Sequence, residues 1–235
     1  MKSSFFALIL AVLASRAALA QDHLIPDVGV LVDPNEYHRK IRHVFGQAFD
    51  KDVTVRVVVL PSFKNEYLVG VRIKVEVAEA FLLEPSSMIW GTELVRLYTS
   101  GHIQRFGGGK EVVLDDDEKF QEMKRRTPAD YRTIKANRKA RPIPRDIADR
   151  LKKLWGDMLL GVKHPVEPID GHDGVTYHFS AWLRGKGDLS GHVWSPDEDS
   201  KTGRLITLVE ELAGYVKDEA SLDEVKSRLD KAAAP

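Results

Sequence analysis

The chain has 235 residues, 43% of them hydrophobic, with 35 Lys and Arg against 35 Asp and Glu and no cysteine. This apolar fraction supports a packed core and excludes global disorder. The absence of cysteine excludes disulfides, thiolate metal sites and a cysteine nucleophile. The zero net charge excludes a uniformly basic coat for nucleic acid.

The first residues have the three parts of a secretory signal peptide. Lys2 supplies a positive charge, residues 5–13 are continuously apolar, and Ala18-Leu19-Ala20 is a small-x-small cleavage site. The apolar run is too short to span a bilayer, which needs about 20 residues. We therefore expect a periplasmic or secreted protein, cleaved after Ala20 and without a transmembrane segment. The mature chain would carry a net charge of −2.

A helix and a β-rich block are expected next. Asp33-Pro34-Asn35-Glu36 is typical of a helix start. Residues 53–60 are rich in valine, and residues 69–77 alternate apolar with polar side chains, which predicts a hairpin. Residues 88–99 and 103–114 offer further strands, so an antiparallel β block is predicted over about 53–114.

The character of the sequence changes after this block. Residues 115–160 are expected to be helical, with helices starting near Asp115, Thr127 and Pro144 and a break at residues 141–144. After a signal peptide at 1–20, the chain divides into a helix plus β region at 21–118 and a helical and hairpin region at 119–235. These two regions could also form a single domain.

The C-terminal part predicts a β-hairpin and two helices. Residues 175–183 and 189–195 flank a Gly-rich turn, and residues 203–216 have an apolar stripe with helical spacing. Ser221-Leu222-Asp223-Glu224 is a capping box for a short last helix. Strands in one block and helices in another predict an α+β fold.

The segment 170–195 holds the densest set of chemically capable side chains. Asp170, His172 and Asp173 could hold a metal in a tight turn, but their spacing matches neither the calcium loop nor the zinc helix. Asp and Gly also make turns without any ligand. We therefore predict no metal and no cofactor, with these three residues as the candidates if a metal binds.

His178 and Ser195 are the candidate catalytic pair. Pairing Arg184 with Leu189 would place Ser195 opposite His178, and a slip of one residue would place Trp194 there. A serine nucleophile also needs an oxyanion hole and an orienting carboxylate, and no G-x-S-x-G motif is present. Cross-strand packing of the aromatic side chains is the competing interpretation.

A ligand-binding face is a further hypothesis for the hairpin. Its candidates are Tyr177, Trp182, His192 and Trp194, since Trp is often partly exposed and can line a ligand site. The alternative is that the hairpin packs under the 203–216 helix as a small core.

Positive charge is concentrated in residues 119–153, which hold 13 Lys and Arg against four Asp and Glu. Such a segment could bind lipid headgroups or another anionic partner through Arg125, Arg126, Arg138, Lys139 and Arg141. A solvated face paired with acidic neighbours is the simpler interpretation. Export makes nucleic acid a poor candidate partner.

Together these patterns favour an exported, non-enzymatic α+β protein that binds a protein, an envelope component or a small ligand. One alternative is a periplasmic hydrolase that uses a His/Asp cluster within 170–195. The other is an anion-binding envelope protein that uses the basic segment 119–153.

Overall fold

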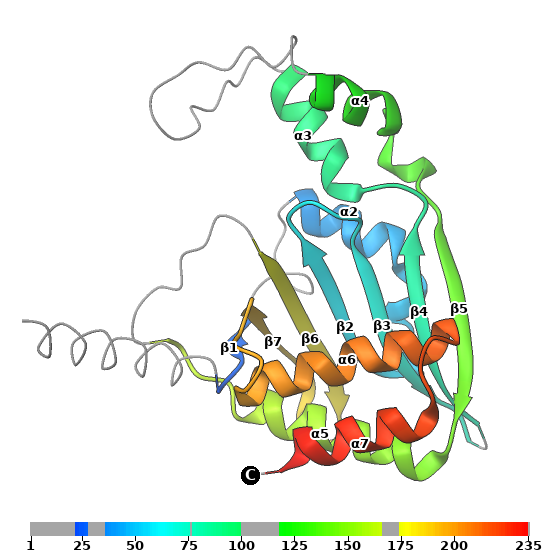
Figure 1. Ribbon diagram of the computed structural model, residues 1–235, viewed down its shortest axis with the longest axis vertical. Coiled ribbons are helices and arrows are strands. Elements are labelled where there is room, and N and C mark those ends of the chain that lie inside the picture. The colour runs from blue at the N-terminus through cyan, green and yellow to red at the C-terminus, as the bar shows by residue number, and fades with distance from the viewer. Residues whose placement is uncertain (1–21, 28–35, 76, 100–117, 166–173, 235) are drawn as a thin grey trace, which may run out of the picture.

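The fold is α+β, as predicted, and is built on one antiparallel sheet (Figure 1). The computed structural model describes residues 22–27, 36–75, 77–99, 118–165 and 174–234. Its sheet has seven strands in the order β1-β7-β6-β2-β3-β4-β5. The sheet thus joins strands from both halves of the chain, because β6 and β7 lie between β1 and β2.

The elements follow one another in a simple order. The strands are β1 (Ile25–Pro26), β2 (Val53–Pro61), β3 (Tyr67–Ile73), β4 (Ala78–Pro85), β5 (Ala136–Ile143), β6 (Val175–Leu183) and β7 (Gly187–Trp194). The α-helices are α2 (Glu36–Val44), α3 (Ile89–Thr99), α4 (Glu118–Arg126), α5 (Arg145–Leu160), α6 (Lys201–Lys217) and α7 (Leu222–Ala233). Short 3-10 helices are η1 (Gly46–Phe49) and η3 (Tyr131–Thr133).

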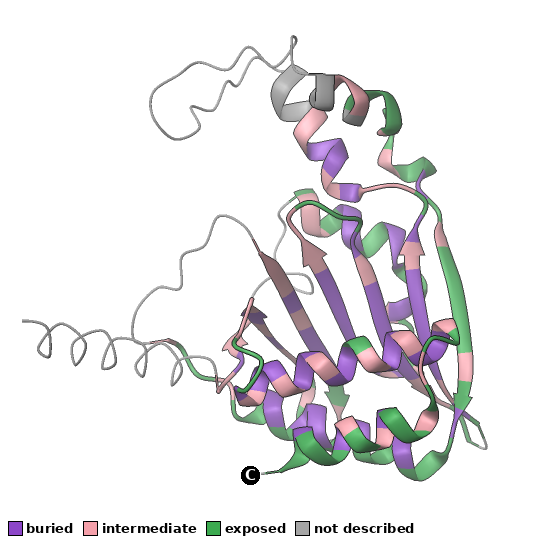
Figure 2. Cartoon of the chain, in the orientation of Figure 1, coloured by how far each residue is buried: buried purple, intermediate pink, exposed green. Residues whose placement is uncertain are grey.

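Helices α5, α6 and α7 cover one face of the sheet and form the main core with it (Figure 1). Val55, Val57 and Val59 of β2 point into this core. The β-branched side chains of β2 suit a strand that is buried on both faces. Figure 2 shows buried residues at intervals along α5 and α6.

The opposite face is covered only in part. Helix α2 and η1 pack a second apolar cluster against β2, β3 and β4, with Phe45 and Phe81 at its centre. A register shift between Val53 and Val55 turns Val53 toward this cluster, on the same side as Val58. The same side of β6 and β7 instead carries His178, Ser180, Ser190 and His192. We call this side of β6 and β7 the open face.

Residues 89–99 form helix α3, whereas the sequence predicted a strand over 88–99. Short apolar runs do not separate strands from helices. Here the buried carboxylate of Glu66 accepts hydrogen bonds from the backbone N–H groups of Ile89 and Trp90, at 2.8 and 2.6 Å. The carboxylate thereby supplies acceptors for backbone N–H groups in the first turn of α3, which have no partner within the helix. The strand predicted over 103–114 lies outside the described residues.

The helix expected after Thr127 is also wrong. Residues 131–133 form one 3-10 turn, and residues 136–143 form β5, which pairs with β4 at the edge of the sheet. Most side chains of β5 are exposed. Edge strands commonly carry such Lys, Arg and Pro residues, which discourage pairing with other chains. A charged edge strand therefore resembled a solvated helix.

The remaining predicted elements are confirmed. They are the 53–61/67–73 hairpin, the helices at 145–160, 201–217 and 222–233, and the 175–194 hairpin. The capping box at Ser221 and Glu224 is formed in both directions. None of the helices in the described ranges has the length and apolar composition needed to cross a membrane.

A candidate metal site on the open face

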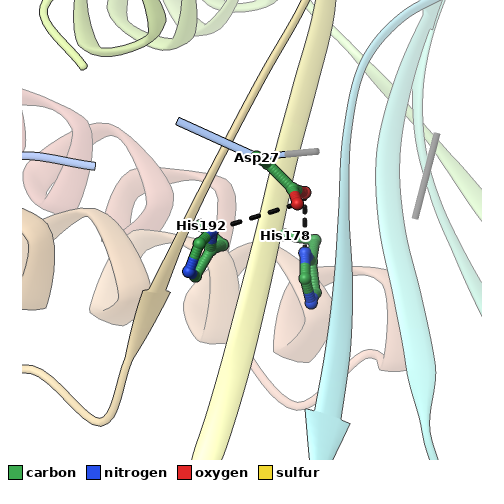
Figure 3. A group of neighbouring side chains, drawn as sticks. All are labelled: Asp27, His178 and His192. Atoms are coloured by element: carbon green, nitrogen blue, oxygen red, sulfur yellow. Dashed lines mark hydrogen bonds and ion pairs between the residues drawn. The ribbon is translucent and has the colours of Figure 1, made fainter. Parts of the chain in front are cut away.

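Three potential metal ligands meet on the open face: Asp27, His178 and His192 (Figure 3). Nδ1 of His178 lies 2.7 Å from one carboxylate oxygen of Asp27, and Nδ1 of His192 lies 3.9 Å from the other. The three ligand atoms all lie within 4.8 Å of one another. They come from three separate segments: the end of β1, β6 and β7.

The β6–β7 hairpin brings the two histidines together. Its turn contains Gly185 and Gly187, both with positive φ (78° and 82°), a conformation that glycine adopts without strain. The resulting register places His178 directly opposite His192. Their ring centroids are 5.6 Å apart, with the ring planes inclined by 31°. Both imidazoles therefore present Nδ1 to the same carboxylate.

Asp27 reaches the site because β1 pairs with the outer edge of β7. Gly191 favours this pairing, because a Cβ atom there would lie only 3.1 Å from the carbonyl oxygen of Ile25 and would push against β1. The hydroxyl of Ser190 then donates to the carbonyl oxygen of Asp27 at 3.0 Å. The chain is thus held before Asp27 by the pairing of β1 with β7 and at Asp27 itself by Ser190.

The site is largely shielded from water but remains accessible on one side. The exposed fraction is 4% for the side chain of Asp27, 11% for His178 and 29% for His192. Burial lowers the pKa of His192, and the charge of His178 lowers it further, while Asp27 offsets part of the effect. Among the described residues, Nδ1 of His192 has no hydrogen-bond partner. His192 is therefore favoured as a neutral imidazole with an unsatisfied ring nitrogen, the form that binds metals.

The spacing fits a tetrahedral metal ion. Zinc bonds of about 2.0–2.1 Å place neighbouring ligand atoms roughly 3.3 Å apart. The observed separations of 2.7 and 3.9 Å lie on either side of that value. Metal binding would require side-chain rotations that bring one oxygen of Asp27 to this spacing from both rings. The donor set is two imidazole nitrogens and one carboxylate.

A third imidazole lies next to this group. The ring of His38, on α2, meets that of His178 edge-on, with centroids 5.7 Å apart. It connects the metal ligands to the helix that covers the neighbouring strands.

The structure separates the predicted pair His178 and Ser195. Both registers considered from the sequence are corrected, because His192 lies opposite His178, and Trp194 lies opposite Thr176. The hydroxyl of Ser195 accepts a hydrogen bond from the backbone N–H of Val175 at 2.9 Å, at the end of the hairpin.

The predicted ligand-binding residues are distributed over both faces of the hairpin. Tyr177 is buried on the main-core side, where its hydroxyl donates to Glu210 at 3.2 Å. Trp182 is half exposed, and Trp194 packs close to Gly174. His192 alone among these four belongs to the group around Asp27. The other metal candidates, Asp170, His172 and Asp173, lie outside the described residues.

The five basic candidates belong to two elements, and acidic side chains contact four of them. Arg125 and Arg126 on α4 pair with Glu122 at 2.6 and 2.5 Å. The other three lie on β5: Arg138 pairs with Glu79, Arg141 pairs with Asp218, and Lys139 is exposed.

Asp27 and His38 were missed because nothing near them in the sequence marks a site. Strand β1 has only two residues, and Asp27 lies 151 positions before its partner His178.

Comparisons of the chain with protein-family models, curated proteins and solved structures found no match.

Proposed function

We propose that this protein binds a divalent transition-metal ion through Asp27, His178 and His192. The observation that carries the proposal is the convergence within 4.8 Å of three ligand atoms, two from the β6–β7 hairpin and one from a segment far away in the sequence. An ion pair between Asp27 and His178 alone would explain how β1 is held. It would not explain a second imidazole that points its unsatisfied Nδ1 at the same carboxylate.

The donor set selects the class of metal. Imidazole nitrogen suits zinc, copper, iron and nickel, whereas calcium and magnesium prefer sites made of oxygen ligands alone. Structural zinc sites usually have four protein ligands, and catalytic sites have three plus water. The chain offers three described ligands and a solvent-accessible side at His192. The proposed ion is therefore of the zinc type, with an exchangeable position.

That exchangeable position favours hydrolysis as a second candidate function. A zinc-bound water has a pKa near 7 and supplies hydroxide at neutral pH. His38, beside His178, is within the same group of imidazoles and could exchange protons with solvent. Hydrolysis of a chromogenic ester or phosphate that needs both added zinc and His192 would support this activity. Turnover that survives His192→Ala would contradict it.

We also propose that the protein is exported. The support is the order of charge, apolar run and small residues in positions 1–20. Expression of the full chain followed by cell fractionation and N-terminal sequencing tests this. We expect an extracytoplasmic product that begins at Gln21. A cytoplasmic product that retains Met1 would contradict export.

Metal binding is tested by titrating zinc against a chromophoric chelator. The wild-type chain is expected to bind one ion. The variants Asp27→Asn, His178→Ala and His192→Ala are each expected to lose at least about tenfold in affinity, since each removes one of three ligands.

His164→Ala is the matched control, because His164 is exposed and outside the site. It should bind zinc as the wild type does. Equal affinity in all the variants would overturn the proposal.

A further inference from the structure

A cleft of about 630 Å³ opens between η1 and the β6–β7 hairpin. The lining residues that matter for its chemistry are Arg42, Phe49, Lys51, Arg56, Trp182 and Asp188. It lies on the same face of the sheet as the metal site, because Arg56 is in register with Ser180, two residues after His178. Two residues along a strand span about 7 Å.

Arg56 forms the floor of this cleft and is an unusual residue for its position. It interrupts the valine run of β2 and is only 7% exposed. Its Nη1 donates to the carbonyl oxygen of Ala48 at 3.3 Å, while its Nε is buried without a hydrogen-bond partner. Within the described part of the chain, no carboxylate forms an ion pair with Arg56.

A buried charge without a counter-ion is costly. The desolvation penalty for such an ion is several kcal/mol, even after the protein relaxes around it. Burial accordingly lowers the pKa of Arg56, Arg42 adds to this effect, and Asp188 opposes it. Arginine nevertheless remains protonated in proteins. The chain therefore holds a permanent positive charge, with unused hydrogen-bond donors, at the base of a cleft.

The surrounding charges add to the positive potential. The guanidinium carbons of Arg42 and Arg56 lie 5.2 and 4.8 Å from the ring centroid of Phe49. Lys51 is exposed at the rim. The carboxylate of Asp50 is engaged by Arg72 at 3.3 Å. Arg42, Lys51 and Arg56 thus face two carboxylates at the cleft, those of Asp50 and Asp188.

Trp182 supplies a different kind of surface. It is half exposed, and it lines the cleft. Together with Phe49 it provides flat apolar area next to the cationic floor. Such an arrangement suits a ligand with one anionic group and one ring.

We propose that the cleft binds a phosphate or carboxylate group carried on an aromatic body, with the anion on Arg56 and Arg42 and the ring against Trp182. This proposal does not depend on the metal site. The anion supplies the counter-charge that Arg56 lacks, and the ring covers Trp182.

The test is a titration of the metal-free mature chain with phenyl phosphate, benzoate and inorganic phosphate, followed by calorimetry and tryptophan fluorescence. We expect phenyl phosphate or benzoate to bind, and the tighter of the two identifies the anionic group. Inorganic phosphate should bind about tenfold more weakly than phenyl phosphate, because it makes no contact with Trp182. Failure of both aromatic anions to bind would overturn the proposal.

Variants then assign the binding to this cleft. Arg42→Ala should weaken the aromatic anion about tenfold, and Trp182→Ala should reduce it to the affinity of inorganic phosphate. Arg56→Gln should abolish binding. Because Arg56→Gln could unfold the chain, the decision rests on the variants at Arg42 and Trp182, which are exposed and can be replaced without unfolding the protein. Arg145→Ala, on α5, is the control and should bind as the wild type does; unchanged binding in both Arg42→Ala and Trp182→Ala would refute the assignment.

Discussion

Zinc is expected to raise the melting temperature of the protein by binding at Asp27, His178 and His192. A ligand that binds only the folded state at 100 times its Kd adds about 2.7 kcal/mol to the free energy of unfolding. For a domain of roughly 150–250 residues, 1 kcal/mol moves Tm by about 2–4 °C. The expected increase is therefore about 5–11 °C.

The structure explains why the unfolded chain should bind zinc much more weakly than the folded protein. The two histidines are 14 positions apart and meet only in the hairpin register, and Asp27 is distant from both in sequence. Unfolding therefore disperses the ligand set. Metal ions bind imidazole only through an unprotonated ring nitrogen, so protons compete with zinc and the increase in Tm should shrink as the pH falls toward 5.

Differential scanning calorimetry with and without zinc measures the effect. The double variant His178→Ala/His192→Ala should show no increase in Tm, while His164→Ala should match the wild type. An equal increase in the wild type and the double variant would refute the reasoning, because the stabilising ion would then bind elsewhere.

Three further predictions concern the parts that support the two sites. Gly191→Val should weaken zinc at least about tenfold in the chelator assay and lower the free energy of unfolding by about 1–3 kcal/mol, since a Cβ there meets the carbonyl oxygen of Ile25 in β1 at 3.1 Å and Cγ1 of Val162 at 3.0 Å; unchanged zinc affinity would contradict this account of how Asp27 is positioned. Glu93→Ala should cost about 3–5 kcal/mol in urea unfolding because it removes the nearer carboxylate of buried Lys40 and leaves Glu36 at 3.6 Å, whereas Lys40→Met/Glu93→Leu should unfold near the wild-type value; a cost below about 1 kcal/mol for the single variant would show that Glu36 or water replaces Glu93. In the metal-free protein, the lowered pKa of His192 means that the unfolded state binds its proton first, so stability should fall as pH decreases below about 6.5, and His192→Gln should show a shallower fall; identical pH profiles would contradict the burial of this imidazole.

The sequence predicted correctly those elements whose signals all lie within the element itself. The 175–194 hairpin has strict alternation and a Gly-rich turn, and the last helix has a full capping box at Ser221 and Glu224. Helix α3 was not predicted because its apolar run is short and because Glu66, which caps its first turn, is distant in sequence. Strand β5 was predicted as a helix because a run of Arg and Lys at a sheet edge looks the same in the sequence as the exposed side of a helix.

The sequence identified two of the three residues of the candidate metal site, but not how they come together. His178 and His192 were recognised as chemically capable, but the register that pairs them depends on the turn geometry at Gly185 and Gly187. Asp27 joins them through a two-residue strand, which carries no sequence pattern. Arg56 was overlooked although a signal was present, since a lone charge inside a valine run is an exception that requires a partner or a ligand.

The most direct test of the metal site observes the ring nitrogens of the two histidines. Long-range proton–nitrogen NMR of the labelled protein distinguishes Nδ1 from Nε2 as zinc is added. We predict that one equivalent of zinc shifts Nδ1 of both His178 and His192 to the metal-bound range, with Nε2 protonated in each ring. Spectra in which neither Nδ1 responds to zinc would contradict the proposal that Asp27, His178 and His192 form a metal site.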